Sequence, residues 1–309
     1  MTIHHDIVAF KKLTNGIATI GIFDGVHIGH KKILQSIVNE SIKCNGESVV
    51  ITFWPHPRIV LANDRSLKLL NTIDEKIALI KDAGIDHLII IPFTNEFAET
   101  SAESFSKNIL ADKIGTKLLF IGYDHRFGRN KEGSFEYLKE NAHRYGFEVR
   151  EISRQDVDNL AVSSTRIRES IEVGQIEVAN ELLGHSYEIH GTVIKGRQLG
   201  RTIGFPTANI ELDEINKMLP KIGVYAVKIS IDDSCYFGML NIGVKPTFND
   251  NNLSIEVNIF DFDKDIYHKK IGISFEKRIR NEQKFASVEE LKQQLIYDKE
   301  TCLRIFQLV

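Results

Sequence analysis

Gly21-Ile-Phe-Asp-Gly-Val-His-Ile-Gly-His30 decides the fold of the first half of this chain. It follows the apolar run Ile17–Ile20, and together they are typical of a strand, a glycine-bearing turn and a helix start. Free backbone N–H groups at a helix start bind anions, and His27 and His30, three residues apart, share one helix face. Gly29 between them carries no side chain that would block a phosphate. We therefore predict an anion site that suits a triphosphate.

A second interpretation of the same residues stays open. His27 could be an ordinary turn histidine and His30 a surface histidine, because four-residue patterns of this kind recur by chance. The preceding Gly-x-Phe-Asp-Gly and the strand-turn-helix context favour the anion site.

Composition limits the classes of protein to consider. A chain of 309 residues exceeds the size at which a single core stops growing, so we expect two domains. With 42% hydrophobic and 26% charged residues the chain can bury a sizeable core. A formal net charge of −3 argues against a general basic surface for nucleic acid, so we expect no nucleic-acid partner.

Cysteine usage and hydropathy indicate the compartment. Cys44, Cys235 and Cys302 are far apart and in no metal-ligand spacing, so neither a disulfide framework nor a zinc site is expected. The N-terminus has no targeting pattern, and no run of about 18 apolar residues occurs. We expect a soluble cytoplasmic protein without a membrane partner, and self-association stays open.

The first half alternates short apolar runs with amphipathic stretches, which predicts an α/β domain with a mostly parallel, Rossmann-like sheet. Strands are expected at 17–23, 48–53, 87–91, 117–122 and 147–152, and helices at 30–45, 72–83, 102–110 and 135–145. Thr72 with Glu75 and Thr100 with Glu103 are the expected helix caps. Ligands of such sheets bind at the carboxyl ends of the strands, where the H-x-G-H segment lies.

The second half has a different pattern. Helices expected at 164–173 and 176–183 end at Gly184, where we place the boundary between domains 1–183 and 184–309. Strands separated by turns rather than helices follow, at 187–194, 224–231, 236–242, 254–262 and 271–278. With a helix at 288–297, they predict a small antiparallel β-barrel and a C-terminal helix.

Three further segments of the first half carry candidate ligand-binding residues. Asp124 and Arg126 lie in a glycine-flanked stretch that could grip a flat polar ligand, or form an exposed ion pair in a surface loop. Trp54 belongs to a proline-stiffened loop that is either functional or a connector. Ser163, Ser164 and Thr165 open a helix whose first turn holds Arg168. Arginine opposes the helix dipole there, so a bound phosphate would explain it.

A glycine-rich segment marks the second half. Gly196, Gly200 and Gly204 precede Pro206-Thr-Ala-Asn209, and such a backbone can point N–H groups at phosphates. The Thr207 hydroxyl and the Asn209 amide oxygen suit a hard cation such as Mg²⁺. A plain long loop is the alternative.

Three more features were weighed in the second half. Glu256 lies in an alternating strand, where a carboxylate usually faces solvent but could take a proton from a substrate hydroxyl. The acidic run Asp261–Asp265 lacks the glycine and terminal Glu of a calcium loop and is interpreted as a hairpin turn. Arg280 could donate to a phosphate or a flavin, or belong to a loop that leads into the last helix.

Taken together, the segments from Gly21 to Phe285 resemble the bacterial bifunctional riboflavin kinase/FMN adenylyltransferase family, also called FAD synthetases. The resemblance implies a nucleotidyltransferase-type first domain that joins FMN to the adenylyl group of ATP and releases pyrophosphate. It implies that the second domain is a riboflavin kinase barrel. ATP, riboflavin and FMN would be the substrates and Mg²⁺ the cofactor.

The resemblance also implies roles for individual residues. His27 and His30 would stabilise charge on the triphosphate, with Arg168 and Ser164 on the same phosphates, and Asp124 would lie at the flavin. In the kinase, Thr207 and Asn209 would hold Mg²⁺ and nucleotide, Glu256 would activate the ribityl hydroxyl, and Arg280 would lie near the flavin phosphate. The residues expected to bind nucleotide or flavin are Gly21, Phe23, Asp24, Gly25, Gly29, Asp124, Ser163, Ser164, Thr165, Gly196, Gly200, Gly204, Pro206 and Arg280.

The sequence departs from the family pattern at His125, Trp54 and Lys245, and these departures concern the flavin contacts and the relative activities. Two other functions are weighed against the leading one. Adenylyl or cytidylyl transfer to another phosphorylated small molecule would need only the first domain. A flavin-binding regulator without catalysis would not need His27, His30, Thr207, Asn209 and Glu256.

Overall fold

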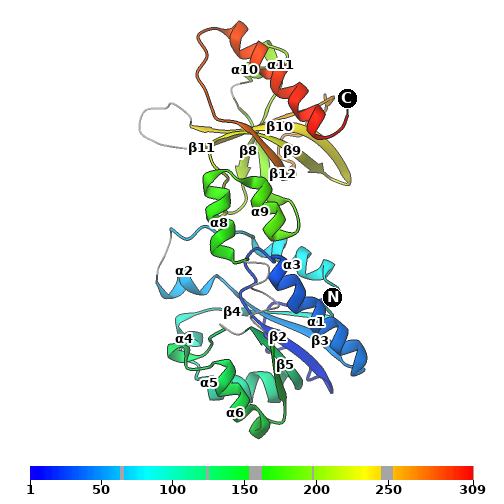
Figure 1. Ribbon diagram of the computed structural model, residues 1–309, viewed down its shortest axis with the longest axis vertical. Coiled ribbons are helices and arrows are strands. Elements are labelled where there is room, and N and C mark those ends of the chain that lie inside the picture. Colours follow the sequence, from blue (N-terminus) through cyan, green and yellow to red (C-terminus); the bar gives the residue numbers. More distant parts are fainter. Residues whose placement is uncertain (63–65, 123–124, 153–161, 197, 245–252, 309) are drawn as a thin grey trace. The chain divides into compact units, whose positions relative to one another are not determined.

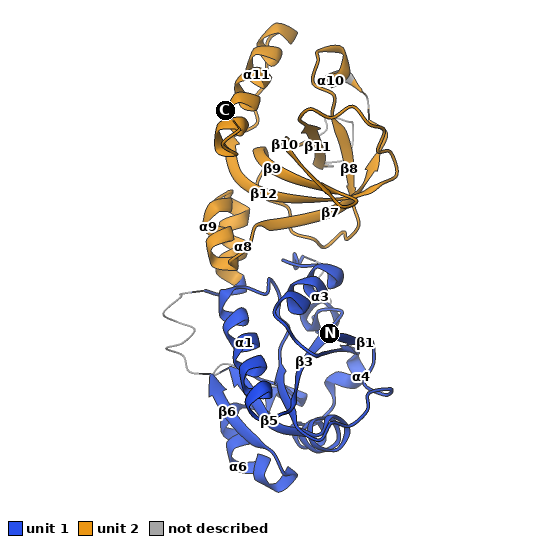
Figure 2. Cartoon of the chain, turned by 90° about the vertical axis from the view of Figure 1, so that its right-hand side faces the viewer, with its two compact units in different colours: residues 1–164 blue, residues 165–309 orange. Residues whose placement is uncertain are grey.

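The computed structural model describes residues 1–62, 66–122, 125–152, 162–196, 198–244 and 253–308 (Figure 1). Asp124 and Lys245 therefore lie outside the described residues. The chain divides into two compact units, Met1–Ser164 and Thr165–Val309 (Figure 2). The domain limits 1–183 and 184–309 stay a prediction, which fragments can test.

A parallel sheet forms the centre of the first unit. Its six strands lie in the order β1-β4-β3-β2-β5-β6, and every pairing is parallel. The strands are β1 (Thr2–His4), β2 (Gly16–Ile20), β3 (Glu47–Trp54), β4 (His87–Pro92), β5 (Thr116–Gly122) and β6 (Glu148–Ile152). The predicted α/β fold is confirmed, with the short β1 as an unpredicted edge strand. Strand order reverses beside β2, and this switch point is where such sheets bind ligands.

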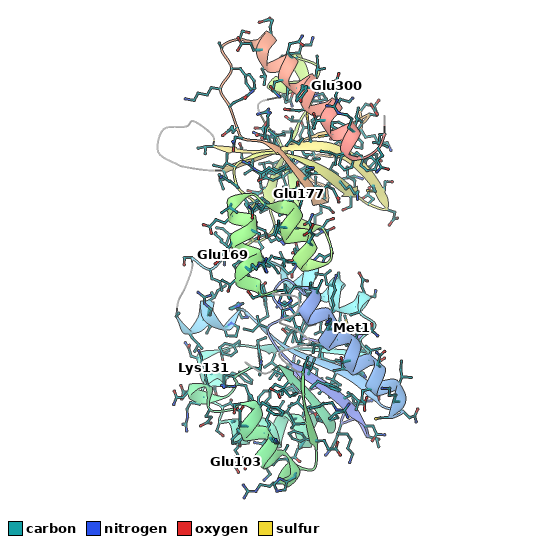
Figure 3. The ribbon with its side chains drawn as sticks, viewed as in Figure 1. Met1, Glu103, Lys131, Glu169, Glu177 and Glu300 are labelled. Atoms are coloured by element: carbon teal, nitrogen blue, oxygen red, sulfur yellow. The ribbon has the colours of Figure 1, made fainter. Side chains whose placement is uncertain are left out.

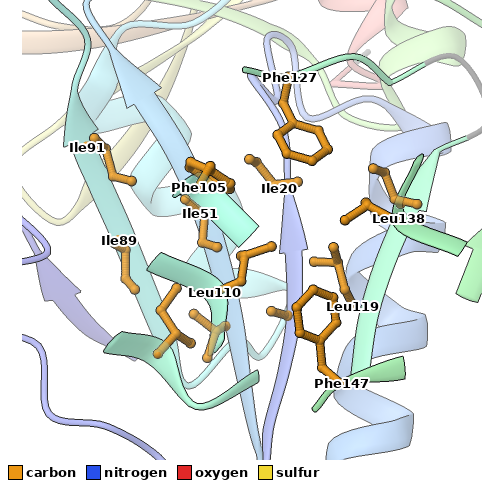
Figure 4. Packing of buried hydrophobic residues seen from close by; sticks show 14 of the residues in the cluster. Ile20, Ile51, Ile89, Ile91, Phe105, Leu110, Leu119, Phe127, Leu138 and Phe147 are labelled. Carbon is orange, nitrogen blue, oxygen red and sulfur yellow. The ribbon is translucent and has the colours of Figure 1, made fainter. Parts of the chain in front are cut away.

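Alternating residues of the central strands fill an apolar core on each face of the sheet, because successive side chains of a strand point to opposite faces. Ala18 and Ile20 of β2 face a core that includes Phe105 and Leu110 (Figure 4). Ile17 belongs to the other core, which includes Leu34 and Ile80 from helices. All five residues of β2 are buried, as expected for a central strand covered on both sides.

Helices of the first unit are α1 (Ile28–Lys43), α2 (Pro57–Leu61), α3 (Ile73–Asp82), α4 (Asn95–Ala98), α5 (Ala102–Ser104) and α6 (Phe135–Tyr145). The expected helix 102–110 continues instead as a π-helix, Phe105–Ile114, and a 3₁₀ turn spans Arg129–Lys131.

The two predicted caps have different outcomes. The capping box of Thr72 and Glu75 is present, with reciprocal hydrogen bonds of 2.9 and 3.2 Å. The cap at Thr100 was wrong: Ser101 precedes the first helical residue in an extended conformation, and its hydroxyl accepts the Ser104 N–H at 3.1 Å.

The second unit is a closed antiparallel barrel of six strands in the order β10-β11-β8-β7-β12-β9, which confirms the predicted barrel. Its strands are β7 (Tyr187–Ile194), β8 (Ala208–Leu212), β9 (Gly223–Ile231), β10 (Ser234–Val244), β11 (Leu253–Ile259) and β12 (Lys270–Arg280). Its helices are α8 (Ser164–Val173), α9 (Ile176–Leu183), α10 (Leu199–Thr202) and α11 (Val288–Ile305). Strand β8 was not predicted, because the glycines and the proline before it indicated a loop.

Helix α9 is joined to the barrel by side-chain contacts. Asn180 donates to the Phe275 carbonyl at 2.8 Å and accepts the Tyr187 N–H at 2.7 Å. Lys277 of β12 lies 3.9 Å from Glu177, which is labelled in Figure 3. This helix, which the sequence places in the first domain, is therefore bonded to strands β7 and β12 of the barrel.

Candidate active sites

The segment between β2 and α1 is a tight loop in an uncommon conformation. Phe23 and Val26 have φ angles of 51° and 38°, and Gly25 has 90°. For an aromatic or β-branched residue this left-handed region costs of order 1–3 kcal/mol, and such residues persist where surrounding contacts fix the chain. The loop is thus held in shape at the carboxyl end of a central strand.

Asp24 joins three segments at this loop. Its side chain is buried, and Oδ1 accepts the backbone N–H groups of Leu70 at 3.1 Å and Asn71 at 3.3 Å. Its backbone carbonyl accepts the Ser164 hydroxyl at 2.9 Å. The predicted binding residues Asp24 and Ser164 therefore lie together, and each already has a partner within the protein.

His27 is the N-cap of α1. Its Nδ1 accepts the His30 backbone N–H at 3.3 Å, so in the neutral ring the proton is on Nε2. The two imidazoles stack, with ring centres 3.6 Å apart and planes 15° from parallel. A Cβ on Gly29 would lie 3.2 Å from the His27 ring and from Val162, so this glycine makes room for the ring.

His30 has an unusual environment. Phe23 meets its ring edge-to-face at 5.1 Å. Burial, followed by the charges of His27 and Lys76, holds the pKa of His30 well below its usual value. Its Nδ1 is buried and has no hydrogen-bond partner among the described residues. A neutral imidazole with an unsatisfied ring nitrogen is a suitable place for a polar ligand atom.

Glu256, Thr207 and Asn209 meet in the barrel of the second unit. Glu256 of β11 pairs directly with Asn209 of β8 in the strand register. The Thr207 hydroxyl donates to Oε2 of Glu256 at 3.4 Å. Asn209 is buried and Glu256 half-buried. Two of the three predicted residues are thus adjacent because of a strand that the sequence did not predict.

Glycines allow close approach around this cluster. A Cβ on Gly196 would collide with the Asn209 amide, and one on Gly200 with the Phe205 carbonyl. Gly204 has φ +85°, which favours glycine, and faces open space. The Pro206 carbonyl next to Thr207 accepts a hydrogen bond from Asn258 at 2.7 Å. Gly196 and Gly200 thus allow close contacts with Asn209 and Phe205 next to Thr207.

A cavity of about 580 Å³ opens beside Thr207. Its wall includes Pro206, Arg201 and Val257, together with the segment 262–267. The interpretation of Asp261–Asp265 as a hairpin turn was wrong, because β11 and β12 on either side of it are not neighbours in the barrel. The segment instead connects two strands that do not pair with each other, and its residues from Phe262 onward line the cavity.

The comparisons with known proteins also divide the chain into an N-terminal and a C-terminal part. A family model described as FAD synthetase matches residues 10–166, and one described as riboflavin kinase matches residues 183–306. A bifunctional riboflavin kinase/FMN adenylyltransferase of Buchnera aphidicola is 41% identical and covers 97% of both chains. The corresponding protein of Escherichia coli is 36% identical over 94% of this chain and 93% of its own. The chain belongs to the bifunctional riboflavin kinase/FMN adenylyltransferase family.

A solved structure supports the fold over both units. The crystal structure from Streptococcus pneumoniae, described as a macrolide-efflux protein, is 30% identical, covers 97% of this chain and 98% of its own, and gives a TM-score of 0.87. In the described part of this chain, no helix is both long and apolar enough to cross a membrane.

Other residues named by the family resemblance lie on α8, just before it, and in the loop after β2. Thr165 and Arg168 are on α8, in the part of this helix that belongs to the second unit, and Ser163 is exposed just before the helix. Gly21 lies under the Phe23 ring, where a Cβ would come within 3.0 Å. The binding roles of these residues stay predictions.

Arg280 is held by the last helix. Its Nε and Nη2 donate to the carboxylate of Asp298 at 2.7–3.0 Å, and Asp298 is completely buried. Nη1 donates to the Asn281 carbonyl at 3.0 Å. The predicted flavin contact of this family member therefore stays a prediction, and the recorded contacts anchor α11 to β12.

Lys76 is the residue that sequence reasoning missed. Only 2% of it is exposed, although it is a lysine on the amphipathic helix α3. The spacing of apolar residues in this helix could have identified it. Ile73, Ile77 and Ile80 lie on the apolar side of the helix, and Lys76 occupies a position on the same side. A lysine is rarely buried unless its charge is compensated, so a lysine at a core position of a helix indicates a specific charge interaction.

Proposed function

We propose that this chain phosphorylates riboflavin to FMN with ATP in its second unit, and adenylylates FMN to FAD with release of pyrophosphate in its first. The observation that carries this proposal is the occurrence of two separate polar clusters, one in each unit. The stacked His27–His30 pair lies in the first and Thr207, Asn209 and Glu256 in the second. Membership of the bifunctional family supports the pairing of the two activities.

In the adenylyl transfer, an oxygen of the FMN phosphate attacks the α-phosphorus of ATP, and the bond to the β-phosphate oxygen breaks. The N–H groups of the neutral His27 and His30 rings stabilise the negative charge that shifts toward pyrophosphate. Orientation and electrostatics suffice, so no covalent intermediate with the protein is needed. Ser164 fixes the loop through Asp24, and Arg168 supplies a further phosphate ligand.

In the phosphorylation, the Glu256 carboxylate accepts the proton of the terminal ribityl hydroxyl, whose oxygen attacks the γ-phosphorus of ATP while ADP leaves. Glu256 is half-buried and its Oε2 already accepts the Thr207 hydroxyl, which orients the carboxylate. The glycines before Pro206 let the backbone approach the nucleotide phosphates closely.

The donor set at Thr207 fits Mg²⁺. A hydroxyl, an amide oxygen and a carboxylate are the hard oxygen ligands that this ion prefers, and Thr207 and Asn209 would hold it. Among the described residues no group of three or more His, Cys, Asp or Glu side chains forms a metal cluster, so a site based on hydroxyl and amide groups with substrate phosphates is favoured. Bound there, the ion would neutralise the phosphate oxygens during transfer.

The proposed partners are the small molecules ATP, riboflavin and FMN. Cys44 and Cys235 are exposed free thiols, and Cys302 is buried and free. Exposed thiols favour a reducing compartment, and the proposed location is therefore the cytoplasm.

Product analysis tests both assignments. The purified chain is incubated with riboflavin, ATP and Mg²⁺, and the flavins are separated by chromatography. We expect FAD from the wild type, FMN as the end product of His30→Ala, and FAD from Glu256→Ala only when FMN is supplied. Loss of a catalytic group of this kind lowers the rate by about 10²–10⁴-fold.

The controls separate the alternatives. His143→Ala replaces an exposed histidine of α6 and should keep both activities. A wild type that binds flavin tightly but forms neither FMN nor FAD would contradict the proposal and favour a regulator. Adenylylation of another phosphorylated acceptor in place of FMN would favour the second enzymatic function.

A further inference from the structure

Among the described residues, those that interact with the buried Lys76 of α3 belong to the first unit. Asp24, which is 5% exposed, stabilises the charge of Lys76, and Lys76 in turn disfavours protonation of His30. The Lys76 ammonium also lies 5.5 Å from the centre of the Trp54 ring at the end of β3. The side chain therefore connects the loop before α1 with the end of the neighbouring strand.

Burial of an ammonium group destabilises the folded state unless an anion compensates for it. Asp24 is one such anion, but its Oδ1 already accepts two backbone N–H groups. Among the described residues no hydrogen bond from the Lys76 ammonium accompanies this attraction. The lysine thus keeps donor capacity in a site whose expected ligands are phosphates.

The position of Lys76 within α3 also affects the electrostatics of its ammonium group. Lys76 follows the capping box of Thr72 and Glu75, so it lies near the N-terminus of α3. The partial positive charge of a helix N-terminus destabilises a nearby cation and attracts an anion. The charge of Lys76 acts on His30, whose buried Nδ1 has no hydrogen-bond partner among the described residues.

We propose that Lys76 is a positioning residue of the adenylyl-transfer site: its buried ammonium interacts electrostatically with Asp24, which favours the Phe23–Val26 turn, and acts as a positive charge on His30 and the substrate phosphates. The inference rests on the proposed function of the first unit. Lys76 acts through Asp24 and His30, so it shapes the site that the phosphates meet.

The protonation states agree with this role. Burial lowers the pKa of Lys76 to about 8, and Asp24 opposes that shift. The ammonium form therefore prevails at neutral pH, and bound phosphates would raise its pKa further. A charged Lys76 also keeps His30 a neutral N–H donor. Among the described residues, the titratable groups of other elements that interact electrostatically with Lys76 are Asp24, in the loop before α1, and His30, in the first turn of α1.

Substitutions in the full-length protein test the proposal. Lys76→Met keeps the approximate length of the side chain without the charge, whereas Lys76→Arg keeps a charge that does not titrate near pH 8. Lys81→Met is the matched control, since Lys81 is an exposed lysine of the same helix. Conversion of FMN and ATP to FAD is measured separately from phosphorylation of riboflavin.

We expect Lys76→Met to lower kcat/KM for FMN adenylylation by about 10²-fold, the usual effect of removing one preorganised electrostatic group. Riboflavin phosphorylation should stay within about twofold, and Lys81→Met should match the wild type. Lys76→Arg should recover most of the loss. Adenylylation by Lys76→Met within threefold of the wild type would overturn the inference, while leaving the function of the first unit intact.

A pH profile distinguishes positioning from a role in folding alone. In the wild type, kcat/KM for adenylylation should fall above about pH 8 as Lys76 loses its proton, and in Lys76→Arg this fall should disappear. An unchanged fall in the arginine variant would overturn the proposal. Thermal unfolding followed by Trp54 fluorescence shows whether Lys76→Met still folds, and if it does not, the arginine profile decides. A wild type that makes FMN but no FAD would refute the function of the first unit itself.

Discussion

His30 is an imidazole kept neutral by its surroundings. Its ring is stacked on His27 and meets the Phe23 ring edge-to-face, so two aromatic rings contact it. Burial is the largest cause of its lowered pKa. At the scale of single residues, the H-x-G-H motif is therefore a pair of mutually oriented N–H donors rather than a pair of cations.

The lowered pKa of His30 predicts a pH dependence of stability. In the unfolded chain this histidine has its ordinary pKa of about 6.5, whereas its pKa in the folded protein is lower. Between the folded and the unfolded pKa, the unfolded state therefore binds more protons than the folded state. The free energy of unfolding of the first unit should therefore fall as pH drops below 6.5, by at most about 1.4 kcal/mol per pH unit for this group. Urea titrations at pH 7.5 and 5.5 measure it.

Trp54 makes that measurement specific to one unit, because it is the only tryptophan of the chain and lies in β3. His30→Gln should reduce the difference in unfolding free energy between the two pH values. His143→Gln, at an exposed position of α6, should leave the difference as in the wild type. Equal pH dependence in His30→Gln and the wild type would contradict the prediction.

At the scale of elements, one buried ion pair fastens the last helix to the barrel. The Arg280 fork of β12 binds Asp298 of α11, and Gln294 of the same helix donates to Asp298 at 2.8 Å. Asp298 has no exposed surface and the Arg280 side chain is 18% exposed. Together with the apolar cluster around Cys302, this pair determines where α11 lies on the barrel.

Removal of one partner of this ion pair should therefore strongly destabilise the second unit. Asp298→Ala leaves the Arg280 guanidinium without its counterion, and we expect the free energy of unfolding of the second unit to fall by about 3–5 kcal/mol. The matched control is Glu177→Ala, which breaks an exposed helix-to-β12 pair with Lys277 and should cost less than about 1 kcal/mol. Hydrogen exchange of β9 and β12 amides across a urea series measures both, and equal losses would refute the distinction.

At the scale of the whole molecule, the limits of the two folding units are open to test. Asn180 of α9 holds Phe275 and Tyr187, and the buried apolar residues of this helix are Ile176, Ala179, Leu182 and Leu183. A fragment 165–309 keeps these contacts, and a fragment 184–309 loses them. We expect the shorter fragment to be less stable by on the order of 5 kcal/mol.

Hydrogen exchange and riboflavin phosphorylation by the two fragments check this expectation. The fragment 165–309 should fold and phosphorylate riboflavin, whereas the fragment 184–309 should lose protection in β7 and β12, where α9 makes its contacts. Equal protection and equal activity would instead support the predicted limits 1–183 and 184–309.

Local signals in the sequence determined much of this protein. Apolar alternation identified four of the parallel strands closely, and the helices 135–145, 164–173 and 176–183 begin and end where predicted. The family, the two-part architecture and the glycine-turn with His27 and His30 also followed from the sequence. These features depend on periodicity, caps and turns, which involve neighbours within a few residues.

Only the tertiary structure decided which distant residues meet. The charge of Lys76 acts on His30 because α3 and α1 cover the same face of the sheet, and Asn209 pairs with Glu256 because β8 pairs with β11. The wrong hairpin at Asp261–Asp265 has the same origin, since the strands on either side of it pair elsewhere. Strand partners and helix faces are chosen by packing between segments tens of residues apart, and local sequence preferences do not encode that choice.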